Sequence, residues 1–267
     1  MNELTHLSLF TGIGGLDLAA EWAGFKTVGQ CEYAEYPTKV LEKNWPEVER
    51  WKDIHELSAV EFYRRTGITE GGQLTCISGG FPCQPHSVAG KRKASGDERD
   101  LWPEYRRVIS EIKPKWVVAE NVRGLLSSED GRFFRGILRD FADLGYDVGW
   151  CCYRAADVGA IHPRERIGII AHSTSLRWNS MDEGEQNRRA NVFIQVRNEW
   201  TRQTNSPLPY VSRILNKPSS GVLRNDDGLS KGMDRLKGLG NSVMPQQYYP
   251  IFKAIAEIER EVKGALC

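Results

Sequence analysis

The chain has 267 residues and a formal net charge of +1, with 36 Lys and Arg residues against 35 Asp and Glu residues. A chain of this length buries roughly three quarters of its unfolded surface, enough for one substantial core and a small additional domain. The balanced charge excludes a protein that is basic all over, so local patches must supply any contact with nucleic acid. Two regions qualify: Lys91-Arg92-Lys93, and the segment Thr174 to Gly232, which has nine basic against six acidic residues.

The cysteines and the apolar runs indicate where the protein resides. Six cysteines, at positions 31, 76, 83, 151, 152 and 267, form no C-x-x-C pair and no spacing suited to zinc, which predicts reduced thiols and no metal. No apolar run approaches the roughly 20 residues of a membrane helix. The amino terminus lacks the basic stretch and long apolar segment of a signal peptide. We therefore expect a soluble, cytoplasmic protein.

Strand-like and helix-like patterns alternate over residues 1 to 172. Such alternation predicts an α/β fold, in which helices cover both faces of a mostly parallel, doubly wound sheet. The expected strands are His6 to Phe10, Thr27 to Cys31, a run ending at Asp53-Ile54, Leu74 to Ser78, Lys115 to Ala119, Tyr146 to Tyr153 and Ile167 to Ala171. The expected helices carry Leu16, Ala19, Ala20 and Ala23; Pro37 to Leu41; the stripe Leu57, Val60 and Tyr63; Trp102 to Ile112; and Phe133 to Leu144.

The composition and the periodicity of the chain change after His172. From residue 173 to about residue 234, polar residues dominate and helical or strand periodicity is weak, which predicts a small second domain. Periodicity returns in residues 235 to 267, where an apolar stripe predicts a helix that packs on the first domain. This stripe consists of Ile251, Phe252, Ile255, Ile258 and Val262. The first domain would therefore comprise residues 1–172 and 235–267.

Polar signals follow three of the predicted strands, and ligands of open α/β sheets bind at the carboxyl ends of strands. The first signal is the glycine-rich run Phe10 to Gly15, with Glu32 17 residues after Gly15 at the end of the second strand. Such a loop fits either a nucleoside cradle, with the acid on ribose hydroxyls, or a plain packing turn. The G-x-G-x-x-G spacing of dinucleotide enzymes is absent, because Leu16 and Asp17 follow Gly15.

The second signal is Cys83, which lies between Pro82 and Pro85 directly after a strand. A cysteine is commonly a small buried apolar residue, but a stiff polar loop favours a nucleophile. The third signal is Glu120 after the run Trp116 to Ala119, either an ordinary strand-end acid or a proton donor. Arg164 and Arg166 fit either a surface salt-bridge run with Glu165 or cations that disperse negative charge.

These motifs together resemble the DNA cytosine-5 methyltransferases, whose signatures are F-x-G-x-G-G, P-C-Q, E-N-V, Q-x-R-x-R and a late G-N-S-V. The corresponding residues occur here in the same order and end with Gly240-Asn241-Ser242-Val243. The resemblance implies a Rossmann-like methyltransferase fold, S-adenosylmethionine as cofactor, no metal, and double-stranded DNA as partner. It also implies that residues 173–234 form a target-recognition domain, that the target cytosine is flipped out of the duplex, and that the origin is prokaryotic or phage.

The resemblance assigns roles to individual residues. Catalysis would fall to Cys83 as the nucleophile on C6 of cytosine, Glu120 at N3 and the exocyclic amine, Arg166 at O2, and Arg164 in support. The cofactor would be bound by Phe10, Gly12, Gly14, Gly15, Glu32, Tyr33, Asp53, Ile54, Pro82, Leu101, Asn241 and Ser242. DNA would be contacted by Gln84, Ser87 and Lys91, within a loop of residues 85 to 100 that closes on it.

Some residues depart from the family pattern, and alternatives remain. His86 stands where Phe is usual, His162 replaces the Gln of Q-x-R-x-R, and the recognition segment is short. A tRNA-methylating relative of the same family shares the catalytic core, although its usual Cys-Phe-Thr tripeptide is missing here. A non-catalytic DNA-binding descendant is the other alternative. We expect a monomer, with a cognate restriction endonuclease as a possible system partner.

Overall fold

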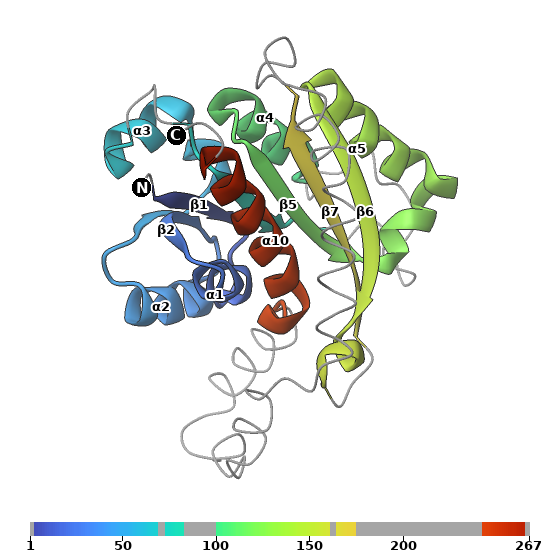
Figure 1. The fold of residues 1–267 in the computed structure, drawn as a ribbon, viewed down its shortest axis with the longest axis horizontal. Helices are drawn as coiled ribbons and strands as arrows, with labels where there is room; N and C mark the ends of the chain where they lie inside the picture. Colours follow the sequence, from blue (N-terminus) through green and yellow to red (C-terminus); the bar gives the residue numbers. More distant parts are fainter. Residues whose placement is uncertain (1–2, 69–72, 83–99, 161–163, 175–241, 265–267) are drawn as a thin grey trace.

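A computed structural model describes residues 3–68, 73–82, 100–160, 164–174 and 242–264. Its described strands form one sheet of seven, in the order β3-β2-β1-β4-β5-β7-β6 (Figure 1). The strands are β1 (Leu4–Leu9), β2 (Phe25–Cys31), β3 (Glu49–Trp51), β4 (Cys76–Gly80), β5 (Trp116–Val122), β6 (Tyr146–Arg154) and β7 (Glu165–Ser173). Every pairing is parallel except those of β7, which runs antiparallel to both β5 and β6. The predicted doubly wound α/β fold is therefore confirmed.

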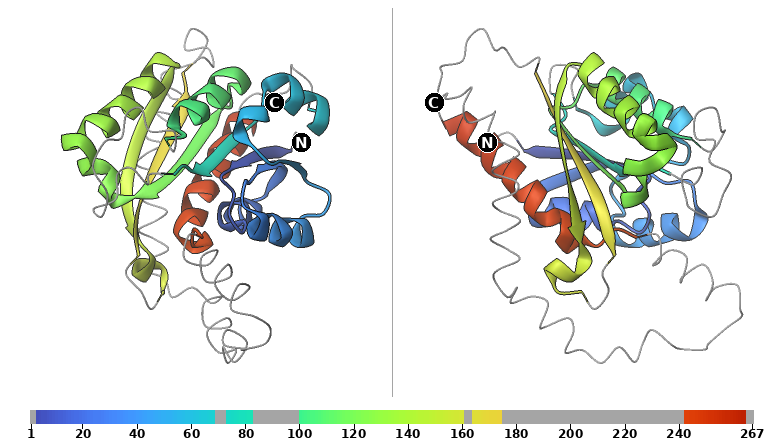
Figure 2. Two further views of the ribbon diagram at one scale, coloured as in Figure 1. Left: turned by 180° about the vertical axis from the view of Figure 1, so that it is seen from behind. Right: turned by 90° about the vertical axis from the view of Figure 1, so that its right-hand side faces the viewer.

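Helices cover both faces of the sheet (Figure 2). One face carries α1 (Gly15–Trp22) and α10 (Pro245–Gly264), and the other carries α3 (Ala59–Thr66), α4 (Trp102–Ile112) and α5 (Arg132–Asp143). The remaining helix, α2 (Glu35–Asn44), follows β2. Alternate residues of a strand point to opposite faces, so Val117 of β5 belongs to the core under α4 and α5, while Trp116 and Val118 belong to the core under α1 and α10.

The carboxy-terminal helix α10 is fixed on the sheet by polar as well as apolar contacts. Ile251, Phe252 and Ile255 are fully buried, which confirms the predicted packing of this helix on the first domain. The Glu259 carboxylate accepts a hydrogen bond from the Trp116 indole (3.0 Å) and forms an ion pair with Lys115 (2.8 Å). At the other end of the helix, the Val243 carbonyl, just before α10, lies against Gly15 of the glycine turn after β1.

One predicted helical stripe was wrong in phase. The stripe Leu57, Val60 and Tyr63 was expected to face the core, but Val60 is 76% exposed and Phe62 is fully buried. The reason lies in the start of α3, where the Ser58 hydroxyl accepts a hydrogen bond from the Glu61 backbone N–H and acts as the N-cap. Leu57 therefore precedes the helix and does not belong to its stripe.

Two further expectations concern the second domain and membrane-spanning helices. The proposed second domain, residues 173–234, lies outside the described residues apart from Ser173 and Thr174. Within the described residues, no helix combines the length and the apolarity needed to cross a bilayer.

Candidate active site

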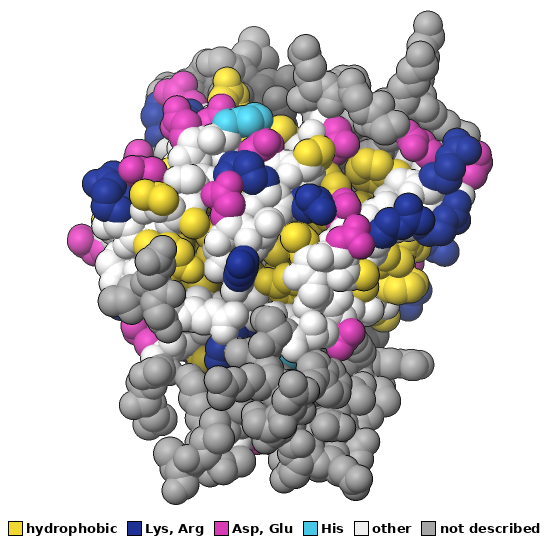
Figure 3. All heavy atoms as spheres, turned by 90° about the horizontal axis from the view of Figure 1, so that it is seen from above, with side chains coloured by type: hydrophobic (Ala, Val, Ile, Leu, Met, Phe, Trp, Pro, Cys, Tyr) yellow, Lys and Arg dark blue, Asp and Glu magenta, His cyan; other side chains and the backbone are white. Residues whose placement is uncertain are grey.

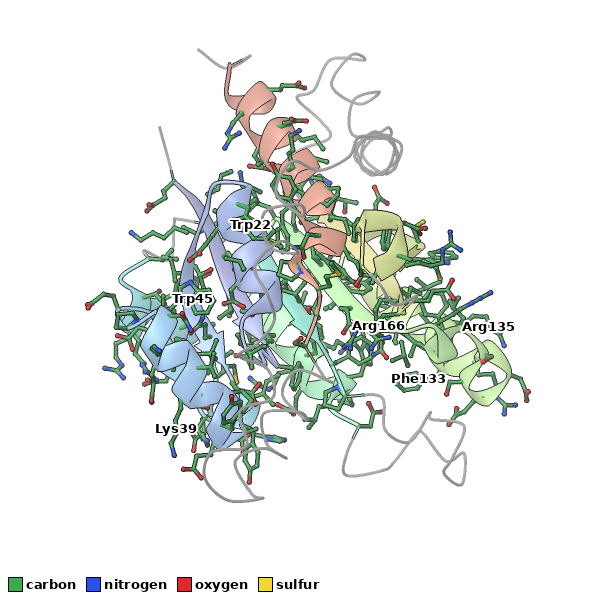
Figure 4. The ribbon with its side chains drawn as sticks, turned by 90° about the horizontal axis from the view of Figure 1, so that it is seen from below. Trp22, Lys39, Trp45, Phe133, Arg135 and Arg166 are labelled. Carbon is green, nitrogen blue, oxygen red and sulfur yellow. The ribbon has the colours of Figure 1, made fainter. Side chains whose placement is uncertain are left out.

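The candidate residues gather at the edge of the sheet where the parallel strands end. Phe10 follows β1 and Pro82 follows β4, while Glu120 lies near the end of β5. Because β7 is antiparallel to β5, its first residues reach this same edge, and Arg166 pairs in register with Val122. Figure 4 shows Arg166 on this side of the molecule.

A largely buried ion pair forms the centre of the site. Arg166 Nε lies 2.9 Å from Glu120 Oε1, and the two side chains are only 17% and 12% exposed. Burial raises the pKa of Glu120, while the positive charges of Arg166 and Arg164 oppose that shift. An acid in this setting can exchange a proton with a bound ring, and the adjacent guanidinium can disperse negative charge.

Two neighbours of Glu120 that the sequence reasoning missed fix its position. Gly80 lies opposite Glu120 in the β4–β5 pairing, and a side-chain Cβ at Gly80 would lie 2.5 Å from Glu120 Oε2. The buried Asn121 donates from Nδ2 to the Phe81 carbonyl at 3.1 Å, which ties the end of β5 to the loop after β4. The sequence signal for Gly80 was the glycine pair that precedes Phe81. The signal for Asn121 was its place within the E-N-V motif.

Arg164 connects this centre with the segment before α10. Its Nη2 donates to the Ser242 carbonyl at 2.5 Å, while burial and the nearby Arg166 lower its pKa. Gln247, at the start of α10, donates from Nε2 to the carbonyls of Arg164 (3.2 Å) and Tyr153 (3.1 Å). Gln247 was also missed, and its only signal was its place four residues after Val243. The predicted catalytic and cofactor groups thus meet at Arg164 and Ser242.

The glycine turn after β1 combines a ligand-compatible surface with tight packing. Gly12 has φ 58° and Gly14 has φ 88°, a left-handed conformation that favours glycine. A Cβ at Gly12 would meet open space, whereas one at Gly14 would strike Trp45 and one at Gly15 would strike the Val243 carbonyl. Gly12 is therefore the one of these three glycines at which a side chain would meet open space.

Glu32 and Tyr33, two further predicted cofactor residues, lie just after the end of β2 beside this turn. Glu32 accepts hydrogen bonds from the backbone N–H groups of Gly12 and Ala34, each at 2.7 Å, and its oxygens retain further acceptor capacity. Tyr33 beside it is 74% exposed, although it is a large aromatic residue. A carboxylate next to an exposed aromatic ring fits a ligand that has both hydroxyl groups and a flat base. The other described members are Phe10, with φ 50°; Asp53, which caps the short helix of the buried Ile54; and Leu101, at the N-cap of α4.

Five predicted residues lie outside the part of the chain that the structure describes. They are Cys83, Gln84, Ser87, Lys91 and Asn241. Pro82 is the last described residue before Cys83, and it lies two residues after the end of β4. The roles of these five residues therefore stay predictions.

Comparison with known proteins identifies the family. The family model for C-5 cytosine-specific DNA methylase matches residues 4–220. The chain is 35% identical to Type II methyltransferase M.FnuDI of Fusobacterium nucleatum, over 66% of this chain and 49% of the relative. It is 42% identical to Type II methyltransferase M.Eco47II of Escherichia coli, over 66% of this chain and 41% of the relative. The match therefore spans about half or less of the length of these relatives.

A solved structure shares the fold. The Entamoeba histolytica methyltransferase EhMeth aligns with a TM-score of 0.53 and 21% identity, over 68% of this chain and 56% of that chain. The sheet order with its antiparallel seventh strand and the Glu120–Arg166 pair agree with the family that the family model identifies. The chain belongs to the C-5 cytosine-specific DNA methylase family.

Proposed function

We propose that this chain is a DNA cytosine-5 methyltransferase that acts on a flipped cytosine in double-stranded DNA. The observation that carries the proposal is the largely buried Glu120–Arg166 ion pair, in which Glu120 lies opposite Gly80 on the strand that leads through Pro82 to Cys83. An acid and a guanidinium held together in this way match the ring nitrogen and the carbonyl of a pyrimidine.

The proposed chemistry begins at Cys83, whose thiolate adds to C6 of the unstacked base. Glu120 holds N3 and the exocyclic amine, and Arg166 binds O2, so that negative charge entering the ring is dispersed. The addition makes C5 nucleophilic. After C5 has taken a methyl group, loss of its proton and release of the Cys83 thiolate restore the aromatic ring. Arg164 positions this pair and links it to Ser242.

S-adenosylmethionine, when bound, would supply an electrophilic methyl group and leave as S-adenosylhomocysteine. The residues around the glycine turn fit this compound, because an exposed aromatic side chain, an acid and an open glycine lie together there. Glu32 would bind the ribose hydroxyls, Tyr33 and Phe10 would contact the adenine, and Asp53, Ile54, Pro82, Leu101, Asn241 and Ser242 would complete the site.

DNA recognition would require parts of the chain beyond the described sheet. We assign sequence recognition to residues 173–234 and contacts with the vacated stack to Gln84, Ser87 and Lys91. Relatives named Type II methyltransferases support a role in a restriction-modification system, with a cognate endonuclease as system partner. We expect the chain to act as a monomer in the cytoplasm.

The decisive experiment measures transfer of labelled methyl from S-adenosylmethionine to duplex DNA and to tRNA. We expect transfer to DNA alone, a covalent adduct on duplex DNA that contains 5-fluorocytosine, and no transfer by Cys83→Ser. The serine hydroxyl is a far weaker nucleophile than a thiolate at neutral pH. A Cys151→Ser variant is the matched control, since Cys151 lies on β6, which β7 separates from β5, and it has no assigned role. Full activity of Cys83→Ser would refute the mechanism, and transfer to tRNA would refute the assigned substrate.

A further inference from the structure

Three arginines form a row on the outer face of α5. Arg132, Arg135 and Arg139 are spaced at i, i+3 and i+7, which places them on one side of a helix. All three are exposed, and Arg135 points outward from α5 in Figure 4. Basic side chains also gather on the side of the molecule where Figure 1 places α5 (Figure 3). We call these three residues the arginine row.

The arginine row begins near the candidate active site. Arg123, 65% exposed, forms an ion pair with Glu165 at 3.0 Å, next in the chain to Arg166. The segment η3 (Arg123–Gly131) then leads directly into α5. The row therefore lies on the helix that follows the segment beside Glu165 and Arg166.

The positive charges of the row are poorly neutralised within the protein. Arg132 lies 3.9 Å from Asp130, whose side chain is 92% exposed, and among the described residues Arg135 donates to the Asp130 backbone carbonyl at 3.3 Å and to no carboxylate. Arg139 forms no ion pair with any residue that the structure describes, although Asp143 follows it at i+4. The opposite side of α5 buries Phe134, Ile137 and Phe141, so the row faces away from the core.

The placement of these charges works against the stability of α5. Arg132 is the first residue of the helix, where a cation opposes the helix dipole, and the first turn contains no acid. The N-cap Gly131 supplies no side-chain hydrogen bond. Arg135 and Arg139 are like charges at i and i+4, which repel each other. These charges lower the stability of the helix, and contacts with the described residues compensate for this only weakly. Residues that oppose local stability in this way are expected at functional sites.

Gly136 lies among the three arginines and supports the same interpretation. It is four residues after Arg132 and three before Arg139, on the same side of the helix. A Cβ at Gly136 would meet nothing within 4 Å, so the packing of the protein does not require glycine there. Glycine in a helix interior is unfavourable, but it lets a bulky backbone come close to the helix.

We propose that the arginine row binds the sugar-phosphate backbone of the duplex that flanks the target base, with Gly136 beneath it. This inference rests on the proposed function, since it takes DNA as the substrate. The row spans about 10 Å along the helix axis, and one DNA strand carries a phosphate about every 3.4 Å. The row can therefore engage two or three phosphates. It supplies a local basic surface in a chain whose net charge is only +1.

The test compares the salt dependence of DNA binding in full-length variants. The affinity for a fluorescent random-sequence duplex is measured over a series of KCl concentrations, for the wild type and for Arg132→Gln/Arg135→Gln/Arg139→Gln. We expect the slope of log affinity against log salt to become shallower by about 0.9 per lost phosphate contact, and thus by about 2 to 3 in total. Arg132→Lys/Arg135→Lys/Arg139→Lys retains the charges and should keep most of the slope.

The matched control removes three exposed charges elsewhere, in Lys26→Gln/Lys39→Gln/Arg64→Gln, whose side chains are 60%, 67% and 65% exposed. An unchanged slope in the row variant, equal to that of this control, overturns the inference and leaves the row as a surface for an acidic protein or for solvent. The proposed function fails separately, through the absence of a 5-fluorocytosine adduct in the wild type. A shallower slope in the row variant would support the inference even then.

Discussion

Gly80 is the residue on which the position of Glu120 depends. A methyl group there would lie 2.5 Å from Glu120 Oε2, and the carboxylate cannot move freely because Arg166 holds it. We therefore expect Gly80→Ala to displace the acid and lower the rate of methyl transfer by about 10²-fold, the typical loss for a misplacement of about 1 Å. Measurement of kcat together with urea unfolding should show a large loss of rate with little loss of stability.

The neighbouring Gly79 provides a contrast at the same scale. A Cβ there would lie 2.7 Å from the Leu9 backbone carbonyl in the adjacent strand, which cannot rotate away. Gly79→Ala should therefore lower the free energy of unfolding, whereas Gly80→Ala should spare it. If both variants lost stability equally, the assignment of Gly80 to the positioning of Glu120 would be wrong.

At the scale of the element, α5 contains a glycine that its own stability does not require. Gly136 is exposed in the middle of the helix, and its surroundings can accept a methyl group. Gly136→Ala should raise the free energy of unfolding by about 0.5 to 1 kcal/mol, because alanine restricts the unfolded chain and favours the helix. Urea unfolding monitored by circular dichroism measures this gain, and a loss of stability would contradict the open space around residue 136.

The elements of the fold were largely predictable from local patterns, whereas their pairing was not. Apolar runs identified β1, β5 and β7, because a strand covered on both faces needs few polar residues. Nothing local indicates that β7 inserts between β5 and β6 in the opposite direction, since pairing is decided by contacts distant in the chain. The phase of α3 was missed because the cap at Ser58, and not the apolar spacing, fixes where that helix begins.

The same distinction applies to the candidate site. Glu120 and Arg166 could be named from motifs, but their ion pair depends on the antiparallel course of β7. Gly14 and Gly15 were assigned to a ligand from the F-x-G-x-G-G motif, yet the side chain of Trp45 and the backbone of Val243 already exclude larger residues there. For Gln247 the sequence offered only its place after Val243, because its two carbonyl partners come from β6 and from the residue before β7.

On the scale of the whole molecule, two buried ionisable side chains act on stability in opposite directions. His6 is enclosed between Thr27 Oγ1 (3.0 Å) and Ser78 Oγ (2.7 Å), and burial lowers its pKa from 6.5 to about 3. Asp17 accepts hydrogen bonds from Ser8 and Gln30, but burial raises its pKa from 3.8 to about 6. The unfolded chain therefore binds a proton at His6 more readily, while the folded chain binds one at Asp17 more readily.

These shifts predict a compensation between pH 3.8 and pH 6. As the pH falls through this window, protonation of His6 in the unfolded state removes stability, while protonation of Asp17 in the folded state adds it. Each contribution changes by about 1.4 kcal/mol per pH unit. Asp17→Asn removes only the contribution of Asp17. On acidification the free energy of unfolding of this variant should therefore fall more steeply than that of the wild type, by about 1.4 kcal/mol per pH unit. Urea unfolding at a series of pH values measures both slopes, and equal slopes would mean that Asp17 does not hold its proton in the fold.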